Sequence, residues 1–212
     1  MELLARPVGP LGTNVHLLVD PATNEAIAID TAIPSLAWIR DELDARGWRL
    51  RLIVSTHGHW DHIGDNAAVA EHTGAAIAVH PLDRDRLLRP EPLWAPFEIP
   101  ASVPAVELAE GGVIRFGALR LEVLHTPGHT EGSVCLYAPD ERLLLSGDTL
   151  FAGGWGRTDL PGGSIEAMVE SLGRLAILDD GCRVLPGHGP TTTIGRERAW
   201  LDRVRRARRL PW

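Results

Sequence analysis

The sequence predicts one α/β domain in which two β-sheets pack together and helices cover their outer faces. Short runs of apolar and β-branched residues, typical of buried strands, recur along the chain. Between several of these runs, apolar residues recur at the spacing of an amphipathic helix. The pattern divides loosely into two halves, each with a run of strands and a helix. Because 212 residues can bury a large core, we predict a single domain over residues 1–212.

In the first half, strands and helices follow one another closely. A turn containing Pro21 and Asn24 joins the first two predicted strands. Ser35 stands near the start of the first predicted helix, and Gly47 follows its last turn. The predicted strands are residues 15–19, 26–29, 51–55 and 75–79, and the predicted helices are residues 33–46 and 66–72.

The segment 89–104 interrupts this alternation. It contains five prolines together with Trp94 and Phe97. Proline lacks an amide hydrogen and its ring disrupts helix interiors, so the segment is neither a regular helix nor a central strand. Long loops in compact domains are often functional, and one hypothesis is that this segment forms a wall of the substrate cleft. The alternative is a connector stiffened by proline.

The second half begins with strands separated by glycine turns and ends in a helix. Ser164 is a suitable N-cap for the longer helix, which follows a glycine-rich loop over residues 151–163. The predicted strands are residues 106–108, 113–116, 119–124, 134–138, 143–145 and 184–185, and the predicted helices are residues 165–178 and 195–209.

The composition is that of a globular protein, with 44% hydrophobic and 23% charged residues. No apolar run approaches the ~20 residues that span a bilayer, and residues 1–7 do not resemble a secretory leader. We therefore expect a cytoplasmic protein without a membrane partner. The formal net charge of −7 argues against a nucleic-acid partner. A homodimer is left open.

Two smaller features have simple interpretations. The chain contains no lysine, so every Lys or Arg position is an arginine. The arginines near the C-terminus are predicted to form the exposed face of a last helix; contact with a partner or an anionic surface is the alternative. They are Arg203, Arg205, Arg206, Arg208 and Arg209. Cys135 and Cys182 form no C-x-x-C motif, and we expect both to be unreactive core thiols.

The densest cluster of metal-binding side chains follows the predicted strand 51–55. The segment Thr56-His-Gly-His-Trp-Asp-His62 contains three histidines and one aspartate. Neutral imidazole and ionised carboxylate are good ligands for divalent ions such as zinc. His57 and His59 can point to the same side of an extended loop, whereas Asp61 and His62 cannot easily join them on one ion. The loop therefore suggests two neighbouring ions.

The remaining ligands must come from later in the chain. Three candidates each lie beside a glycine, directly after a short apolar run: His129, Asp148 and His188. Each alone would be an ordinary turn residue. Together they repeat the arrangement of the first cluster, and strand ends are a common place for a site in an α/β protein.

This signature, T-H-x-H-x-D-H followed by a distant His, an Asp and a last His, resembles that of the metallo-β-lactamase superfamily. The resemblance extends from about Gly12 to about Arg198. It implies the αββα four-layer sandwich. The motifs around His129, Arg157 and His188 resemble those of short glyoxalase II-like hydrolases, which are similar to hydroxyacylglutathione hydrolases.

The resemblance also implies how the ligands are shared. One ion would take His57, His59 and His129, the other would take Asp61, His62 and His188, and Asp148 would bridge them. Zinc is the expected metal, with iron or manganese as alternatives. Asp61 and Asp148 are then the expected catalytic residues: the two ions would hold a shared hydroxide that attacks the substrate, Asp61 would orient it, and Asp148 would bridge the ions. An aspartate at position 30 would lie near the metal loop; an ordinary turn carboxylate is the alternative.

The substrate depends on the glycine-rich loop. In glyoxalase II this loop carries a basic and an aromatic residue that contact glutathione. Arg157 is the candidate substrate-binding residue here, whereas Asp159 stands near the aromatic position and Arg157 could instead pair with it. A second departure is that 24 residues follow His188, fewer than the helical extension of full-length glyoxalase II.

We expect a metal-dependent hydrolase that cleaves a small-molecule thioester, such as an acylglutathione or a related acyl-thiol. The first alternative is a persulfide dioxygenase, a similar enzyme with one iron, which His57, His129 and Asp148 would hold here as a facial triad. A lactonase is a further alternative. The last is a metal-dependent binding module without catalysis.

Overall fold

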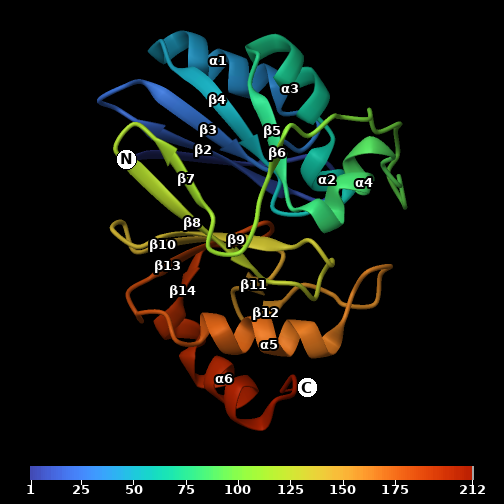
Figure 1. The fold of residues 1–212 in the computed structure, drawn as a ribbon, viewed down its shortest axis with the longest axis vertical. Coiled ribbons are helices and arrows are strands. Elements are labelled where there is room, and N and C mark those ends of the chain that lie inside the picture. Colours follow the sequence, from blue (N-terminus) through green and yellow to red (C-terminus); the bar gives the residue numbers. More distant parts are fainter. Residues whose placement is uncertain (212) are drawn as a thin grey trace.

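The computed structural model describes residues 1–211, and Trp212 lies outside the described residues. Two six-stranded sheets stack face to face, and helices cover the outer face of each (Figure 1). The predicted αββα arrangement of four layers is therefore confirmed. The first sheet and its helices come from the first half of the chain, and the second sheet and its helices from the second half.

The first sheet combines antiparallel and parallel strands. Its order is β1-β2-β3-β4-β5-β6, with antiparallel pairing from β1 to β3 and parallel pairing from β3 to β6. The parallel strands need crossover segments, which include α1 and α3. The elements are β1 (Glu2–Val8), β2 (Thr13–Asp20), β3 (Glu25–Ile29), α1 (Leu36–Arg46), β4 (Arg49–Val54), α2 (Trp60–Ile63), α3 (Asn66–Thr73), β5 (Ala76–Val79), η1 (Pro81–Asp83), α4 (Arg84–Leu88) and β6 (Val106–Glu107).

The second sheet is mostly antiparallel. Its order is β14-β13-β10-β9-β8-β7, in which β10 and β13 pair in parallel. The helices α5 and α6 cover its outer face, and β11 and β12 form a small separate hairpin. The elements are β7 (Val113–Phe116), β8 (Leu119–His125), β9 (Val134–Ala138), β10 (Leu143–Gly147), β11 (Leu150–Phe151), β12 (Gly154–Trp155), α5 (Ile165–Leu175), β13 (Arg183–Pro186), β14 (Thr192–Thr193) and α6 (Ile194–Ala207).

The core has three apolar layers, and alternate residues of one strand enter different layers. On β2, Leu17 packs under the first-half helices while Leu18 packs between the sheets. On β3, Ala28 and Ile27 divide in the same way. Because successive side chains point to opposite faces, a strand buried on both faces is apolar throughout. This explains why residues 17–19 of β2 and 26–29 of β3 are visible in the sequence as apolar runs.

The predicted boundaries differ from the structure at α1. The helix was predicted from residue 33 and begins at Leu36, with Ser35 in the N-cap position. The Ser35 side chain makes no capping bond; the Asp65 carboxylate accepts the backbone amides of Ser35 and Leu36 instead. A cap supplied from 30 residues away leaves no local signal in the sequence. By contrast, Ser164 accepts the amide of Ala167 and caps α5 as predicted.

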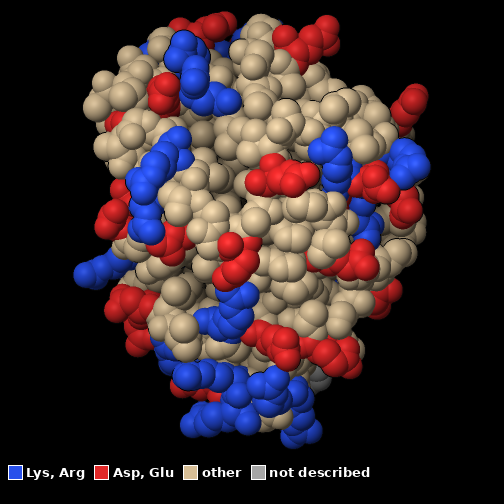
Figure 2. Space-filling model, viewed as in Figure 1, with Lys and Arg blue, Asp and Glu red and all other residues tan. Residues whose placement is uncertain are grey.

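Two further predictions can be compared with the structure. The five C-terminal arginines are exposed on and just after α6, as predicted. Figure 2 shows basic side chains gathered at the end of the molecule where α6 lies. Both cysteines are buried free thiols, and burial raises the pKa of each to about 11. Among the helices of residues 1–211, none is long and apolar enough to cross a bilayer.

Candidate metal centre

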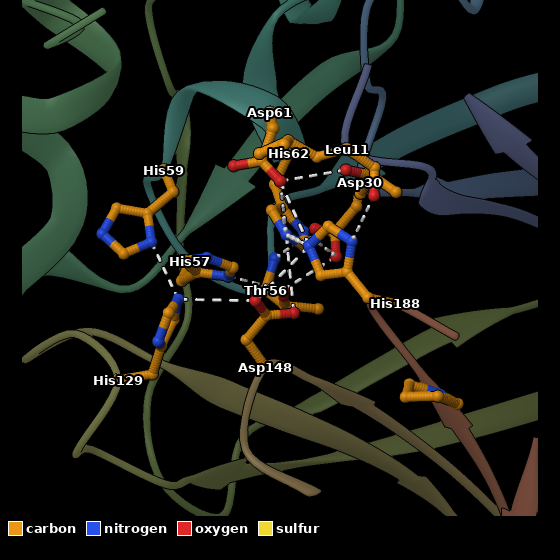
Figure 3. Close-up of polar contacts among 12 residues, drawn as sticks. Leu11, Asp30, Thr56, His57, His59, Asp61, His62, His129, Asp148 and His188 are labelled. Atoms are coloured by element: carbon orange, nitrogen blue, oxygen red, sulfur yellow. Dashed lines mark hydrogen bonds and ion pairs between the residues drawn. The ribbon is translucent and has the colours of Figure 1, made fainter. Parts of the chain in front are cut away.

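The seven predicted ligands converge at one end of the two sheets, where loops from both halves of the chain meet (Figure 3). Four of them come from the loop after β4 and from α2, and three come from loops after β8, β10 and β13. All are buried except His188, which is partly exposed. They are His57, His59, Asp61, His62, His129, Asp148 and His188.

One group of three consists of His57, His59 and His129, with one nitrogen of each within 4.8 Å of the others. Nδ1 of His59 lies 2.8 Å from Nε2 of His129. Two imidazole nitrogens bound to one tetrahedral zinc at the usual Zn–N length lie about 3.3 Å apart. The three side chains are therefore close to the geometry of a shared ion.

A second group consists of Asp61, His62 and His188. Nε2 of His188 lies 3.1 Å from both Nε2 of His62 and Oδ2 of Asp61. Asp148 lies between the two groups, because its oxygens are 3.4 Å from Nε2 of His129 and 3.5 Å from Nε2 of His62 and of His188. This placement suits a ligand that two ions share.

Unsatisfied buried atoms indicate that cations belong here. Within residues 1–211, Nε2 of His57 and Oδ1 of Asp148 are buried and have no hydrogen-bond partner, and the same holds for Nε2 of His59. Each such atom costs about 1–3 kcal/mol when left unpaired. A divalent ion would satisfy the first two, and imidazole with carboxylate is a donor set that zinc, iron and manganese accept. The residues present therefore fit a pair of divalent ions.

Carboxylate and hydroxyl groups fix the orientation of two histidines. The Asp30 carboxylate accepts the Thr56 amide at 2.7 Å and the Thr56 hydroxyl at 2.8 Å. The Thr56 oxygen is thus left to accept Nδ1–H of His57 at 3.1 Å, and Asp30 accepts Nδ1–H of His62 at 2.9 Å. Nε2 of each histidine then presents its lone pair to the centre. Asp30 accordingly lies against the metal loop, as the resemblance implied.

Backbone carbonyls orient two other histidines. The carbonyl oxygen of Arg157 lies 2.7 Å from Nδ1 of His129. The carbonyl oxygen of Leu11 lies 3.1 Å from Nδ1 of His188. In both cases the bond assigns the proton to Nδ1 and leaves Nε2 free as a ligand.

The electrostatic environment differs between the two groups. Burial lowers the pKa of His57 well below its ordinary value and that of His59 to about 3, and neighbouring histidines act in the same direction. Burial also opposes protonation of His62 and His188, but nearby carboxylates outweigh it and raise both pKa values. Without metal, His57 and His59 are thus neutral near pH 7, whereas protonation is favoured at His62 and His188.

An apolar cleft of about 430 Å³ opens over these ligands. The proline-rich segment contributes Leu93 and Trp94 to its wall, as one hypothesis predicted, while Phe97 and Ile99 pack into the core as a connector would. Trp94 is 68% exposed, so part of its ring is accessible to a ligand. Besides metal ligands, the cleft is lined by Leu11, Trp60, Leu93, Trp94, Phe151, Gly156, Arg157 and Leu160.

Arg157 is placed at the cleft but is paired. Its guanidinium makes two bonds of 2.7 Å to the carboxylate of Asp159 and lies 5.6 Å from the centre of the Trp94 ring. The salt bridge that was the alternative interpretation is therefore present. Both side chains are exposed, and exposed ion pairs are weak enough for a ligand to displace.

Two residues that the sequence did not single out support the second group. Thr13 donates its hydroxyl to Oδ2 of Asp61 at 3.0 Å. Asn14 donates its side-chain amide to the carbonyls of Pro186 and Gly189, on either side of His188. The available signal was a pair of adjacent polar residues, Thr13 and Asn14, at the start of a predicted buried strand.

Comparisons with known proteins agree with this architecture. The chain is 39% identical over 200 residues to an uncharacterised protein of Aquifex aeolicus, with 92% of each chain covered. It is 37% identical over 202 residues to a hydroxyacylglutathione hydrolase of Maricaulis maris, which covers 95% of this chain and 72% of that protein.

Three solved structures are similar over nearly the whole chain. The B3 metallo-beta-lactamase BLEG-1 has a TM-score of 0.86 at 33% identity, with 92% and 96% of the two chains covered. TTHA1623 in a di-iron-bound form has a TM-score of 0.82 at 33% identity, covering 98% of each chain. ETHE1 from Myxococcus xanthus has a TM-score of 0.81 at 28% identity, covering 97% of this chain and 85% of that one. Residues 8–188 match the family described as the metallo-beta-lactamase superfamily, and the chain therefore belongs to that superfamily.

Proposed function

We propose that the protein hydrolyses small-molecule thioesters with two divalent ions, zinc in the first instance, held by the seven ligands. The observation that carries the proposal is the convergence of two sets of metal ligands beside an apolar cleft, which five of the seven ligands line. Water adds to the thioester carbonyl, the carbon–sulfur bond breaks, and the products are a carboxylic acid and a thiol.

The residues of the cleft favour water as the nucleophile. Both cysteines are buried in the core, and no serine or cysteine lines the cleft within the described residues. When bound, the ions supply a hydroxide near neutral pH and polarise the substrate carbonyl. The carboxylate oxygens of Asp61 and Asp148 are further hydrogen-bond acceptors in the site. The apolar walls of the cleft exclude bulk water from it.

The thioester substrate rests on two lines of support. The hydroxyacylglutathione hydrolase of Maricaulis maris is 37% identical to this chain. The cleft offers apolar surface for an acyl-thiol and one cation, Arg157, for a substrate carboxylate. We therefore propose Arg157 as the substrate-binding residue.

The test is turnover of S-lactoylglutathione and of an uncharged acyl-thiol, S-acetyl-N-acetylcysteamine, by the metal-replete protein. Release of free thiol is followed with a colorimetric thiol reagent. Turnover of either compound that is lost in His129→Ala supports the proposal. Absence of turnover of both by protein that contains two ions would refute thioester hydrolysis.

A persulfide dioxygenase is the second candidate, favoured by the likeness to ETHE1 and by the position of three residues. His57, His129 and Asp148 would hold a single iron for oxygen chemistry: His57 is grouped with each of the other two, and Oδ2 of Asp148 lies 3.4 Å from Nε2 of His129. Oxygen consumption with glutathione persulfide, together with one iron per chain, would favour it. Hydrolysis of a small lactone in the same assay series would indicate the lactonase instead, and binding without turnover would indicate a binding module.

A further inference from the structure

Asp83 is a fully buried carboxylate that lies outside the ligand set and contacts two of the ligand-bearing loops. It ends η1, just after β5 in the first half of the chain. Its Oδ2 accepts the Gly58 amide and the Thr130 hydroxyl, each at 2.7 Å, and its Oδ1 accepts the Gly132 amide at 3.0 Å. Each of these donors belongs to a loop that carries metal ligands.

The donors surround one group of ligands and not the other. Gly58 separates His57 from His59, and Thr130 follows His129 directly. These three histidines form the first group. Asp83 therefore fastens the loop from the first sheet to the loop from the second sheet at the place where the first group must assemble. The other buried carboxylate, Asp30, contacts His62 of the second group directly and reaches His57 only through Thr56.

The residues around Asp83 allow its carboxylate to approach the backbone of the ligand loops closely. A β-carbon at Gly132 would lie 2.6 Å from Cγ of Asp83, so only glycine admits the carboxylate here. Arg86 also joins the arrangement: its Nε lies 3.5 Å from Oδ1 of Asp83, and its Nη2 donates to the carbonyl of Pro161 at 2.7 Å. The carboxylate is thus linked to the glycine-rich loop as well.

We propose that Asp83 is a positioning residue that holds His57, His59 and His129 in register for one ion across the two sheets. This inference rests on the proposed metal centre but not on the identity of the substrate. Groups that orient metal ligands typically change metal affinity by 10–100-fold when they are removed. That effect should fall on one of the two ions.

The variant Asp83→Asn tests this, with Asp20→Asn as the matched control. Asparagine keeps one acceptor oxygen and adds a donor, so one of the two buried glycine amides loses its acceptor. Asp20 is also buried and accepts two backbone amides, of Ala22 and Ala118, and the Thr23 hydroxyl. It lies at the end of β2 away from Thr13, so its loss destabilises the fold without touching the ligand loops.

Two quantities are measured for both variants: the melting temperature of the metal-free protein, and zinc affinity by competition with a chromogenic chelator. We expect both variants to melt earlier, and only Asp83→Asn to bind one of the two ions 10–100-fold more weakly. Equal zinc affinity in the two variants would overturn the proposal. Failure of the wild type to bind zinc would instead refute the proposed function.

If Asp83→Asn does not fold, Thr130→Val provides the same test at lower cost, because it removes a single donor to the carboxylate. We expect a smaller loss of affinity for the same ion. Wild-type affinity for both ions in Thr130→Val would then overturn the proposal.

Discussion

Oδ2 of Asp30 lies 2.9 Å from Nδ1 of His62, and the same oxygen accepts the Thr56 hydroxyl. One buried carboxylate therefore sets the proton position on His62 directly and on His57 through Thr56. Asp30 adopts a positive φ of 57° to reach this position at the end of β3. The backbone strain indicates that the surrounding structure holds the carboxylate in place.

The variant Asp30→Asn should bind metal 10–100-fold more weakly, because the amide cannot accept from all of the donors that Asp30 now serves. Chelator competition measures the loss. The second ion should be affected most, since His62 belongs to that group. Asp20→Asn is again the control, and an equal affinity in the two variants would contradict the role assigned to Asp30.

Removal of metal should lower the melting temperature. A ligand at 100 times its dissociation constant stabilises the folded state by about 2.7 kcal/mol, which corresponds to roughly 5–10 °C for a domain of this size. Thermal melts before and after chelation measure the shift. Zinc should restore it, whereas magnesium, which prefers oxygen ligands, should not. An unchanged melting temperature would contradict metal binding by the buried histidines.

The two ions should differ in proton release. His57 and His59 have lowered pKa values and are neutral near pH 7, so metal has few protons to displace there. His62 and His188 have raised pKa values and hold protons below them, so metal binding to the second group must release these protons. Affinity of the second group should therefore rise with pH, by about tenfold per pH unit for each proton displaced, until the raised pKa values are passed.

Calorimetric titrations in buffers of different ionisation enthalpy count these protons. The ion that releases fewer protons on binding should be the one that Asp83→Asn binds more weakly, because that ion is held by the first group. Equal proton release on binding of the two ions would contradict the difference in histidine pKa values between the two groups.

Arg157 and Asp159 offer a paired test of substrate binding. If Arg157 holds a substrate carboxylate, Arg157→Met should raise KM for S-lactoylglutathione by about 10–100-fold, since a charged hydrogen bond contributes about 1.5–3 kcal/mol. Asp159→Asn should lower that KM, because it removes the carboxylate that now competes for the guanidinium. Neither variant should change KM for the uncharged acyl-thiol. If both variants impair the enzyme equally, the pair only shapes the loop.

The sequence predicts most of the fold because the strands that carry the core are buried on both faces. The apolar runs of β3 (residues 26–29) and β10 (residues 143–145) are visible for that reason. The edge strand β1 was missed, since it is largely exposed and contains Pro7. Helix α4 was missed because it has five residues and no room for a periodic pattern.

The ligand residues could be found from the sequence because histidine and aspartate beside glycine at strand ends form a repeated pattern. Most of the residues that orient them could not, although the family resemblance placed Asp30 near the metal loop. The carbonyl of Leu11 serves His188 across 177 positions, and any residue type could supply it. Asp83 and Asp30 are ordinary carboxylates until the fold places amides and hydroxyls around them.

The most direct test of the metal centre is the metal content of protein purified without chelator, measured by elemental analysis for the wild type and two variants. The wild type should contain two ions per chain, and His129→Ala and His188→Ala should each contain one, because each removes a ligand of a different group. A wild type without bound metal, or variants that both retain two ions, would contradict the account.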